Sequence, residues 1–102
     1  MGPEQTIAEL EAVFEHEAAT DKRAAAETAY ALAWRHRSEY VGEGHPFDNA
    51  KAWAERAIGL LDALPSETLD QVASTRTSVG GVPLPDLLHS GVVRERLADV
   101  LR

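Results

Sequence analysis

The stretch Ser74–Asp86, which reads STRTSVGGVPLPD, holds the densest group of side chains that could do chemistry. It places four hydroxyl groups and one arginine ahead of the pair Gly80-Gly81. Such side chains, together with the backbone N–H groups of a turn, can bind an anion. The lysine and the glycine spacing of a nucleotide-binding loop are missing, so that motif is absent. The candidate ligand-binding residues are Arg76, Ser78, Arg35 and Arg37.

The same stretch has a second interpretation, as an ordered connection between helices. Its two glycines are suited to a turn, and the two prolines that follow stiffen the chain. Val79, Val82 and Leu84 are spaced as apolar anchors onto a core. These features favour a connection, with the anion site as the alternative.

The four histidines lack the spacing of a metal site. His16 lies between Glu15 and Glu17, but neighbouring side chains on a helix point about 100° apart, so these three do not converge on one ion. No pair of histidines has the close helical spacing of a zinc motif. We therefore expect histidines at the surface, no metal and no cofactor.

Groups that could catalyse a reaction are also sparse. Cysteine is absent, and Ser90 beside His89 lacks the strand and turn that expose a nucleophilic serine. Pairs such as Glu27 with Arg23 are interpreted as solvated ion pairs within a helix, worth about 0.2–0.5 kcal/mol each. We therefore do not expect an enzyme.

A basic cluster near a tryptophan could hold a phosphate or a nucleic acid strand by charge and stacking. The overall acidity instead favours pairing of these side chains with nearby glutamates. The cluster comprises Arg35, His36, Arg37, Lys51 and Arg56. The large aromatic residues are candidates for a protein interaction surface, namely Trp34, Tyr40 and Trp53.

The composition limits the kinds of binding partner and the cellular compartment that are expected. The net charge of −7, from 17 acidic and 10 basic residues, argues against duplex nucleic acid or an anionic membrane as the main partner. The absence of cysteine suits a reducing cytoplasm, and no apolar run has the length of a membrane span or a signal core. The predicted location is cytoplasmic. Abundant arginine and alanine suit a GC-rich bacterial genome.

The elements that position these residues are predicted to be helices of one domain, residues 1–102. No proline or glycine occurs between Glu4 and Val41, which strongly favours helix. Thr6 and Glu9 have the spacing of a capping box, and Thr20-Asp21 can cap a second helix that begins at Lys22. The apolar pattern also allows one unbroken helix through residues 4–41. We favour a break near Thr20, because so long a helix would extend beyond a compact domain of this size.

Further helices follow. Residues 42–46 predict a turn, and Asp48 or Asn49 is expected to cap a third helix that ends before Pro65. A short fourth helix is predicted from Ser66 to Ala73. A helical turn from Pro85 to His89 precedes a final helix that starts near Ser90-Gly91, carries Val93 and Leu97 inward and ends at Arg102. The predicted fold is all-α, a small bundle of four to five helices with no convincing strand.

The segment FDNAKAWAERAI, residues 47–58, resembles the second helix of a tetratricopeptide repeat. Phe47 lies three residues before the small Ala50, and Leu32-Ala33 matches the leucine and small residue of the first helix, whereas His36 replaces the usual aromatic. The resemblance covers residues 28–65 and implies a scaffold that binds proteins or peptides. An array needs about three repeats for stability, and one is found. A generic alanine-lined helical hairpin explains the same residues.

Together these features predict a protein–protein interaction or assembly module. A homodimer is one form of it, because alanine-rich stripes on more than one face of the second helix could exceed what one small domain covers. The alternative is a small-ligand or anion-binding regulatory domain that uses the Arg76 loop.

Overall fold

The computed structural model describes residues 6–39, 46–63, 73–86 and 90–98 of the 102-residue chain. The helices are α1 (Ile7–Thr20), α2 (Lys22–Glu39), α3 (Pro46–Ala63) and α5 (Ser90–Arg96), and two short strands, β1 (Ser78–Val79) and β2 (Val82–Pro83), form a hairpin. The predicted all-α bundle is therefore confirmed, with a small hairpin added. None of the helices in these ranges combines the length and apolarity needed to cross a membrane.

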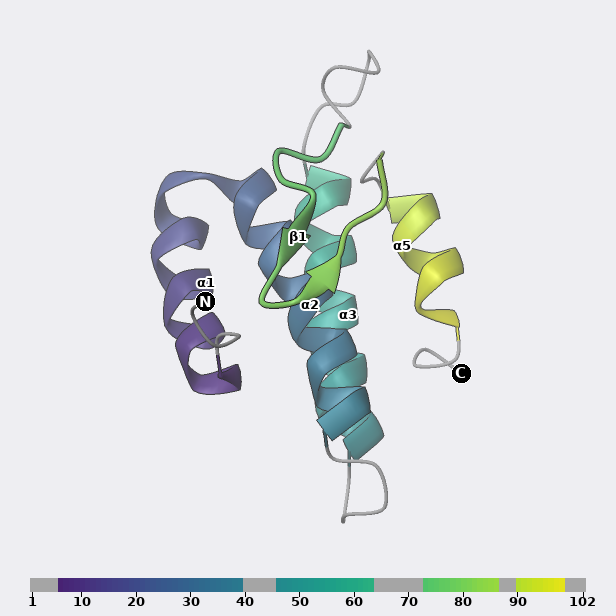
Figure 1. Cartoon of the computed structure of the whole chain (residues 1–102). Coiled ribbons are helices and arrows are strands. Elements are labelled where there is room, and N and C mark those ends of the chain that lie inside the picture. Colours follow the sequence, from purple (N-terminus) through teal and green to yellow (C-terminus); the bar gives the residue numbers. More distant parts are fainter. Residues whose placement is uncertain (1–5, 40–45, 64–72, 87–89, 99–102) are drawn as a thin grey trace.

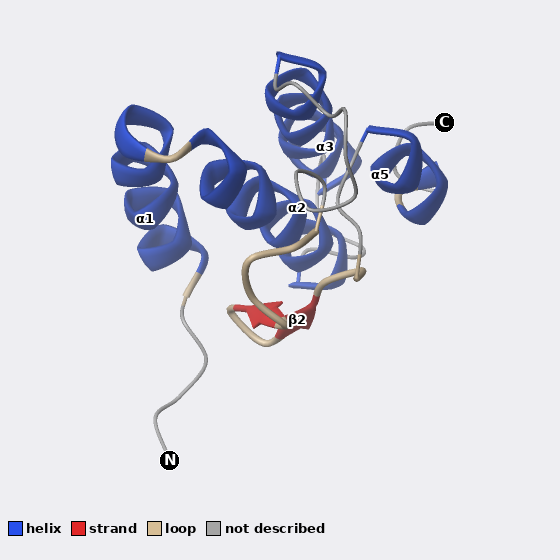
Figure 2. Ribbon diagram, turned by 90° about the horizontal axis from the view of Figure 1, so that it is seen from above, coloured by secondary structure: helices blue, strands red, loops and turns tan. Residues whose placement is uncertain are grey.

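Helix α2 lies at the centre of the molecule. Figure 1 shows α1 and α5 on opposite sides of the α2–α3 pair, and the view from above in Figure 2 places the hairpin and α3 on opposite faces of α2. All nine consecutive residues Ala25–Ala33 are buried. Nine residues cover more than two full turns, so α2 has no exposed face along this segment. Five of the nine are alanine, and such small side chains let α1, α3 and the hairpin approach closely.

Most of both predicted apolar stripes of α2 is covered within one chain. The stripes run through Ala26, Tyr30, Ala33 and Trp34 on one side and through Ala25, Ala29 and Leu32 on the other, and all except the half-buried Trp34 are at most 3% exposed. Val41 and Tyr40, with which the two predicted stripes end, lie outside the described residues. Much of the apolar surface on which a homodimer was expected is therefore buried in the monomer, and the homodimer itself stays a prediction.

Local capping chemistry separates α1 from α2. The Thr6 hydroxyl accepts from the backbone N–H of Glu9, and the Glu9 carboxylate accepts from the N–H of Thr6, which confirms the predicted capping box. Asp21 is extended, with φ −149° and ψ 98°, and its carboxylate accepts from the N–H groups of Arg23 and Ala24. The break near Thr20 and the start at Lys22 are confirmed, and the unbroken helix is wrong.

Helix α3 begins at Pro46, earlier than the predicted cap at Asp48 or Asn49. Proline suits the first helical position, because its fixed φ is helical and its missing N–H would have no partner there. α2 and α3 run in opposite directions side by side (Figure 1). The resemblance to a tetratricopeptide hairpin stays a prediction, since antiparallel helix pairs occur in many helical folds.

Other predicted elements fall partly outside the described residues. The fourth helix, residues 66–72, lies there, whereas Ala73 is extended and makes an isolated bridge. The helical turn ending at His89 also lies largely outside. Helix α5 starts at Ser90, and Val93 and Leu97 are fully buried, as predicted.

The hairpin corrects the prediction that the chain has no strand. Val79 pairs with Val82 and Ser78 with Pro83 in antiparallel register. Gly80 and Gly81 have φ of 54° and 83°, and two positive values define the type I′ turn that fits a two-residue hairpin. Val79 is buried, and Val82 and Leu84 pack partly buried against the core, so the predicted turn and anchors are confirmed.

Replacement of Gly80 by alanine is expected to destabilise the fold. Its φ of 54° strains an L residue, and an added Cβ would lie 2.7 Å from Cδ1 of Leu10 in α1. We expect Gly80→Ala to lower the free energy of unfolding by about 1–3 kcal/mol, measured by urea denaturation.

Gly59→Ala in α3 is the matched control. Nothing lies within 4 Å of its added Cβ, so the helix should gain about 0.5–1 kcal/mol from alanine. Equal effects of the two substitutions would contradict the close contact of the hairpin tip with α1.

Candidate functional site

A group of polar side chains joins α2 to the segment before β1. The Glu27 side chain is 0% exposed. Its carboxylate accepts the backbone N–H of Thr75 at 2.5 Å, the Thr75 hydroxyl at 2.7 Å and Arg76 Nε at 2.9 Å. A buried carboxylate is tolerated only when it is paired and hydrogen bonded, and the loop supplies both partners.

Arg76 joins this carboxylate to α1. Its Nη2 donates to the Ala24 carbonyl at 2.9 Å and to the Thr28 hydroxyl at 3.4 Å, and its Nη1 lies 3.2 Å from Glu17 Oε2. Thr28 in turn donates to Glu17 Oε1. Glu17, Glu27, Thr28, Thr75 and Arg76 form one connected group, which we call the Glu27 network.

Two other arginines attach the hairpin region to α2. Arg35 donates from Nη1 to the carbonyl of Gly80 at 2.9 Å, and Arg23 donates to the carbonyl of Ala73 at 3.4 Å. Arg35 therefore holds the turn of the hairpin, and Arg23 holds the start of the segment that leads into it.

The predicted ligand-binding residues lie at separate places. Arg76 contacts α2 at Ala24, Glu27 and Thr28, seven to eleven residues from Arg35, which corresponds to roughly 10–16 Å along the helix axis. Arg37 is two residues from Arg35, so the two side chains leave the helix on nearly opposite sides. Ser78 is exposed on β1. Arg76 is thus separated from Arg35, and Arg35 from Arg37.

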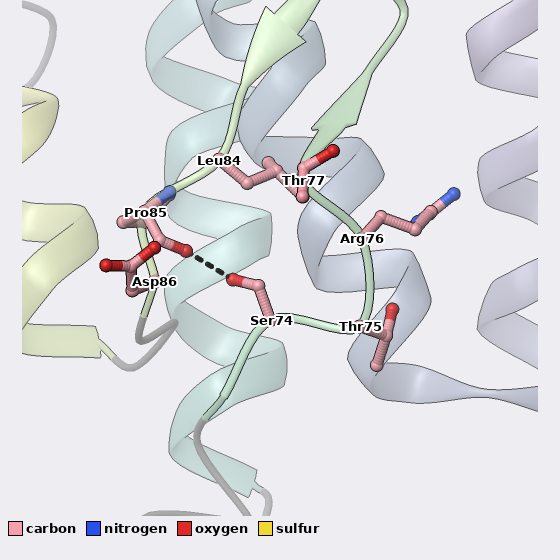
Figure 3. Close-up of a pocket in the computed structure, with 7 residues that line it drawn as sticks. All are labelled: Ser74, Thr75, Arg76, Thr77, Leu84, Pro85 and Asp86. Carbon is pink, nitrogen blue, oxygen red and sulfur yellow. Dashed lines mark hydrogen bonds between the residues drawn. The ribbon is translucent and has the colours of Figure 1, made fainter.

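A small pocket of about 220 Å³ lies between the two legs of the hairpin segment (Figure 3). One leg contributes Ser74, Thr75, Arg76 and Thr77, and the other contributes Leu84, Pro85 and Asp86. The Ser74 N–H donates to the Asp86 carbonyl at 3.0 Å, and the Leu84 N–H donates to the Thr77 carbonyl at 2.9 Å, so backbone hydrogen bonds close both ends.

The aromatic candidates do not share one surface, and Trp53 is 8% exposed and part of the core rather than on the surface as expected. Trp53 of α3 meets Phe14 of α1 edge to face, with ring centroids 4.9 Å apart, and Arg56 lies 4.4 Å above the Trp53 ring. Trp34 is half-buried on α2, two residues and therefore about 200° from the α1-facing His36, so it points away from α1. Tyr40 lies outside the described residues.

Two expectations about titratable residues are wrong. Glu27 is not a solvated surface acid, because it is fully buried and bound to the loop. His36 is 6% exposed rather than on the surface, and its Nε2 lies 3.8 Å from Glu11 Oε2. His16 is exposed as expected, and His45 and His89 lie outside the described residues. Within the described ranges, no three His, Asp or Glu side chains are placed to share a metal ion.

Sequence reasoning found Arg76 but missed its partners in the Glu27 network. The available signal was the position of Glu27 in a run of alanines that occupies both apolar stripes of α2. An acid surrounded by buried positions needs a cation from elsewhere in the chain.

Comparison of the chain with protein-family models, with curated proteins and with solved structures gives no match.

Loss of the Arg76 guanidinium should strongly destabilise the protein. Arg76→Ala leaves the Glu27 carboxylate buried without its cation, and removal of one partner from such a pair costs about 3–5 kcal/mol. The measurement is the free energy of unfolding from urea denaturation at neutral pH.

Arg94→Ala is the control for that experiment. Arg94 is 60% exposed and lies 3.7 Å from the exposed Asp62, so its loss should cost less than about 1 kcal/mol. A similar loss for both variants would show that the Glu27 network is not the main anchor of the loop.

Proposed function

We propose that the chain is a protein–protein interaction or assembly module. The observation that carries this proposal is the surface at Phe14 and Arg56 over the buried Trp53 ring, which is 8% exposed; we call these three residues the Trp53 patch. It joins α1 to α3 outside the central helix. Aromatic residues and arginine are enriched in protein interfaces and dominate their binding energy.

The geometry of the Trp53 patch suits this role. Arg56 is exposed and covers the Trp53 ring, which is only 8% exposed, so a partner would contact the Arg56 guanidinium rather than the indole. Phe14 is only partly buried and extends the apolar area onto α1. The edge-to-face contact holds both rings in place, which lowers the conformational entropy lost on binding.

The described polar groups support binding rather than catalysis. The acids and the arginine of the Glu27 network are hydrogen bonded to one another and hold the hairpin in place. These interactions give each charged group a structural role, so a catalytic role is not needed to explain why the groups are there.

Self-association is one form of the proposal. Because residues 25–33 of α2 are buried within the monomer, a homodimer would have to use another surface, such as the Trp53 patch. Light scattering at micromolar concentration distinguishes self-association from binding of a different protein. If the chain is a monomer, its partner must be a different protein.

The anion-binding alternative has less support. Arg76, the cation on which it depends, lies within hydrogen-bonding distance of Glu27 and close to Glu17. Two carboxylates on one guanidinium offset its attraction for a further anion.

Truncation of Arg56 should weaken the interaction. The immobilised chain would be used to isolate a partner, and its affinity for the purified partner would then be measured by calorimetry. We expect Arg56→Ala to weaken binding about fivefold or more, the effect of losing an interface residue worth more than 1 kcal/mol.

Lys51→Ala is the matched control, since Lys51 is also an exposed cation of α3 but, five residues from Arg56, lies on another side of the helix. Unchanged affinity of the Arg56 variant, or an equal loss in both variants, would contradict a role for the Trp53 patch.

A further inference from the structure

We propose that the pocket between the two hairpin legs binds a primary ammonium group carried on an aliphatic stem, as in a lysine side chain of a protein partner. The assignment to a partner depends on the proposed function, whereas the preference for an ammonium group depends only on the pocket.

The size of the pocket limits what can enter. Its volume of about 220 Å³ corresponds to roughly seven water molecules at about 30 Å³ each. Pockets for cofactors and drug-sized ligands are typically about 300–1,000 Å³. A single side chain or a small headgroup therefore fits, and a nucleotide does not.

Of the three hydroxyl groups at the pocket, those of Ser74 and Thr75 present acceptors rather than donors, and Figure 3 shows the Thr77 hydroxyl directed away from the leg that holds Leu84. A hydroxyl has one hydrogen to donate. Ser74 donates its hydrogen to the carbonyl of Pro85 at 2.6 Å, and Thr75 donates its hydrogen to Glu27 (Figure 3 shows the Ser74 bond). The Ser74 and Thr75 oxygens keep lone pairs, which can accept a hydrogen bond from an incoming N–H group.

The charged groups favour a cation as well. The Arg76 guanidinium donates to Glu27, Ala24 and Thr28 and pairs with Glu17, and Figure 3 shows its side chain directed away from the leg that holds Pro85. Asp86, which lines the pocket, is exposed and can only accept when ionised.

An apolar wall completes the match. Leu84 is half-buried and Pro85 is buried, and both line the pocket. Lysine commonly packs its methylene stem on apolar surface and keeps its ammonium group among polar partners. The combination of this wall with acceptor oxygens selects against an anion and against a purely apolar ligand.

The test uses NMR titration of the 15N-labelled full chain at constant pH and ionic strength. The probes are N-acetyl-lysine methylamide and 1,5-diaminopentane, and the comparison compounds are N-acetyl-norleucine methylamide and inorganic phosphate. We expect both amines to shift the amide signals of residues 74–77, 84 and 86 saturably. A tighter lysine derivative assigns the pocket to a protein side chain, and a tighter diamine assigns it to a free amine; both support the ammonium site.

Asp86→Asn should weaken amine binding about tenfold, since it removes a charge-assisted hydrogen bond without changing side-chain shape. Glu55→Gln is the matched control, because it removes an exposed carboxylate of α3 that does not line the pocket. An amide spectrum of Asp86→Asn with the dispersion of a folded protein would show that the loss of binding is not due to unfolding.

Four results would overturn the proposal: no saturable shift with amines at tens of millimolar, equal shifts with the norleucine compound, binding unaffected by Asp86→Asn, or binding of phosphate in place of amine. Each leaves the proposed function intact if Arg56→Ala still weakens partner binding, because Arg56 does not line the pocket.

Discussion

A carboxylate within the fully buried stretch Ala25–Ala33 of α2 is the constraint on which the rest of the structure depends. Transfer of Glu27 from water into the interior would cost several kcal/mol if it were uncompensated. Arg76 and Thr75, far along the chain, supply the charge and the hydrogen bonds that compensate it. The segment before β1 must therefore lie against α2, and the same guanidinium reaches Glu17 of α1. One guanidinium, paired with two carboxylates, thus links α1, α2 and the hairpin.

The composition of α2 follows from the same arrangement. A helix with neighbours around its whole circumference cannot carry many large side chains, because the surrounding elements would be held too far away for close packing. Alanine at five of the nine positions in Ala25–Ala33 solves this problem. Larger groups are found where the neighbours leave room, as with Tyr30 and Leu32.

The features that could be predicted from sequence are those set by local chemistry. The capping box of Thr6 and Glu9, the break at Asp21 and the glycine turn at Gly80 each depend on residues within a few positions of one another. Thus the helix order and the apolar anchors of the hairpin agree with expectation. The two strands were not predicted, because a strand of two residues is too short to show an alternating pattern of apolar and polar residues.

The features that could not be predicted depend on distant parts of the chain. Glu27 and Arg76 are separated by 49 positions, and no local pattern indicates that they pair. The sequence therefore left Arg76 as a candidate for ligand binding, the alternative to an ordered connection, whereas its guanidinium is engaged by Glu17, Ala24, Glu27 and Thr28. His36 is a similar case, since its burial follows from the position of α1 rather than from its own helix.

The register of the hairpin has a consequence for solubility. Val79 and Val82 flank the turn, and the Thr77 carbonyl accepts from Leu84, so Ser78 and Pro83 between them form a pair without mutual hydrogen bonds. The backbone nitrogen of Pro83 is therefore directed to the outer edge of β2. A proline nitrogen has no hydrogen to donate, so this edge cannot offer a strand from another molecule an N–H at that position. The residue that stiffens the hairpin also protects it against edge-to-edge aggregation.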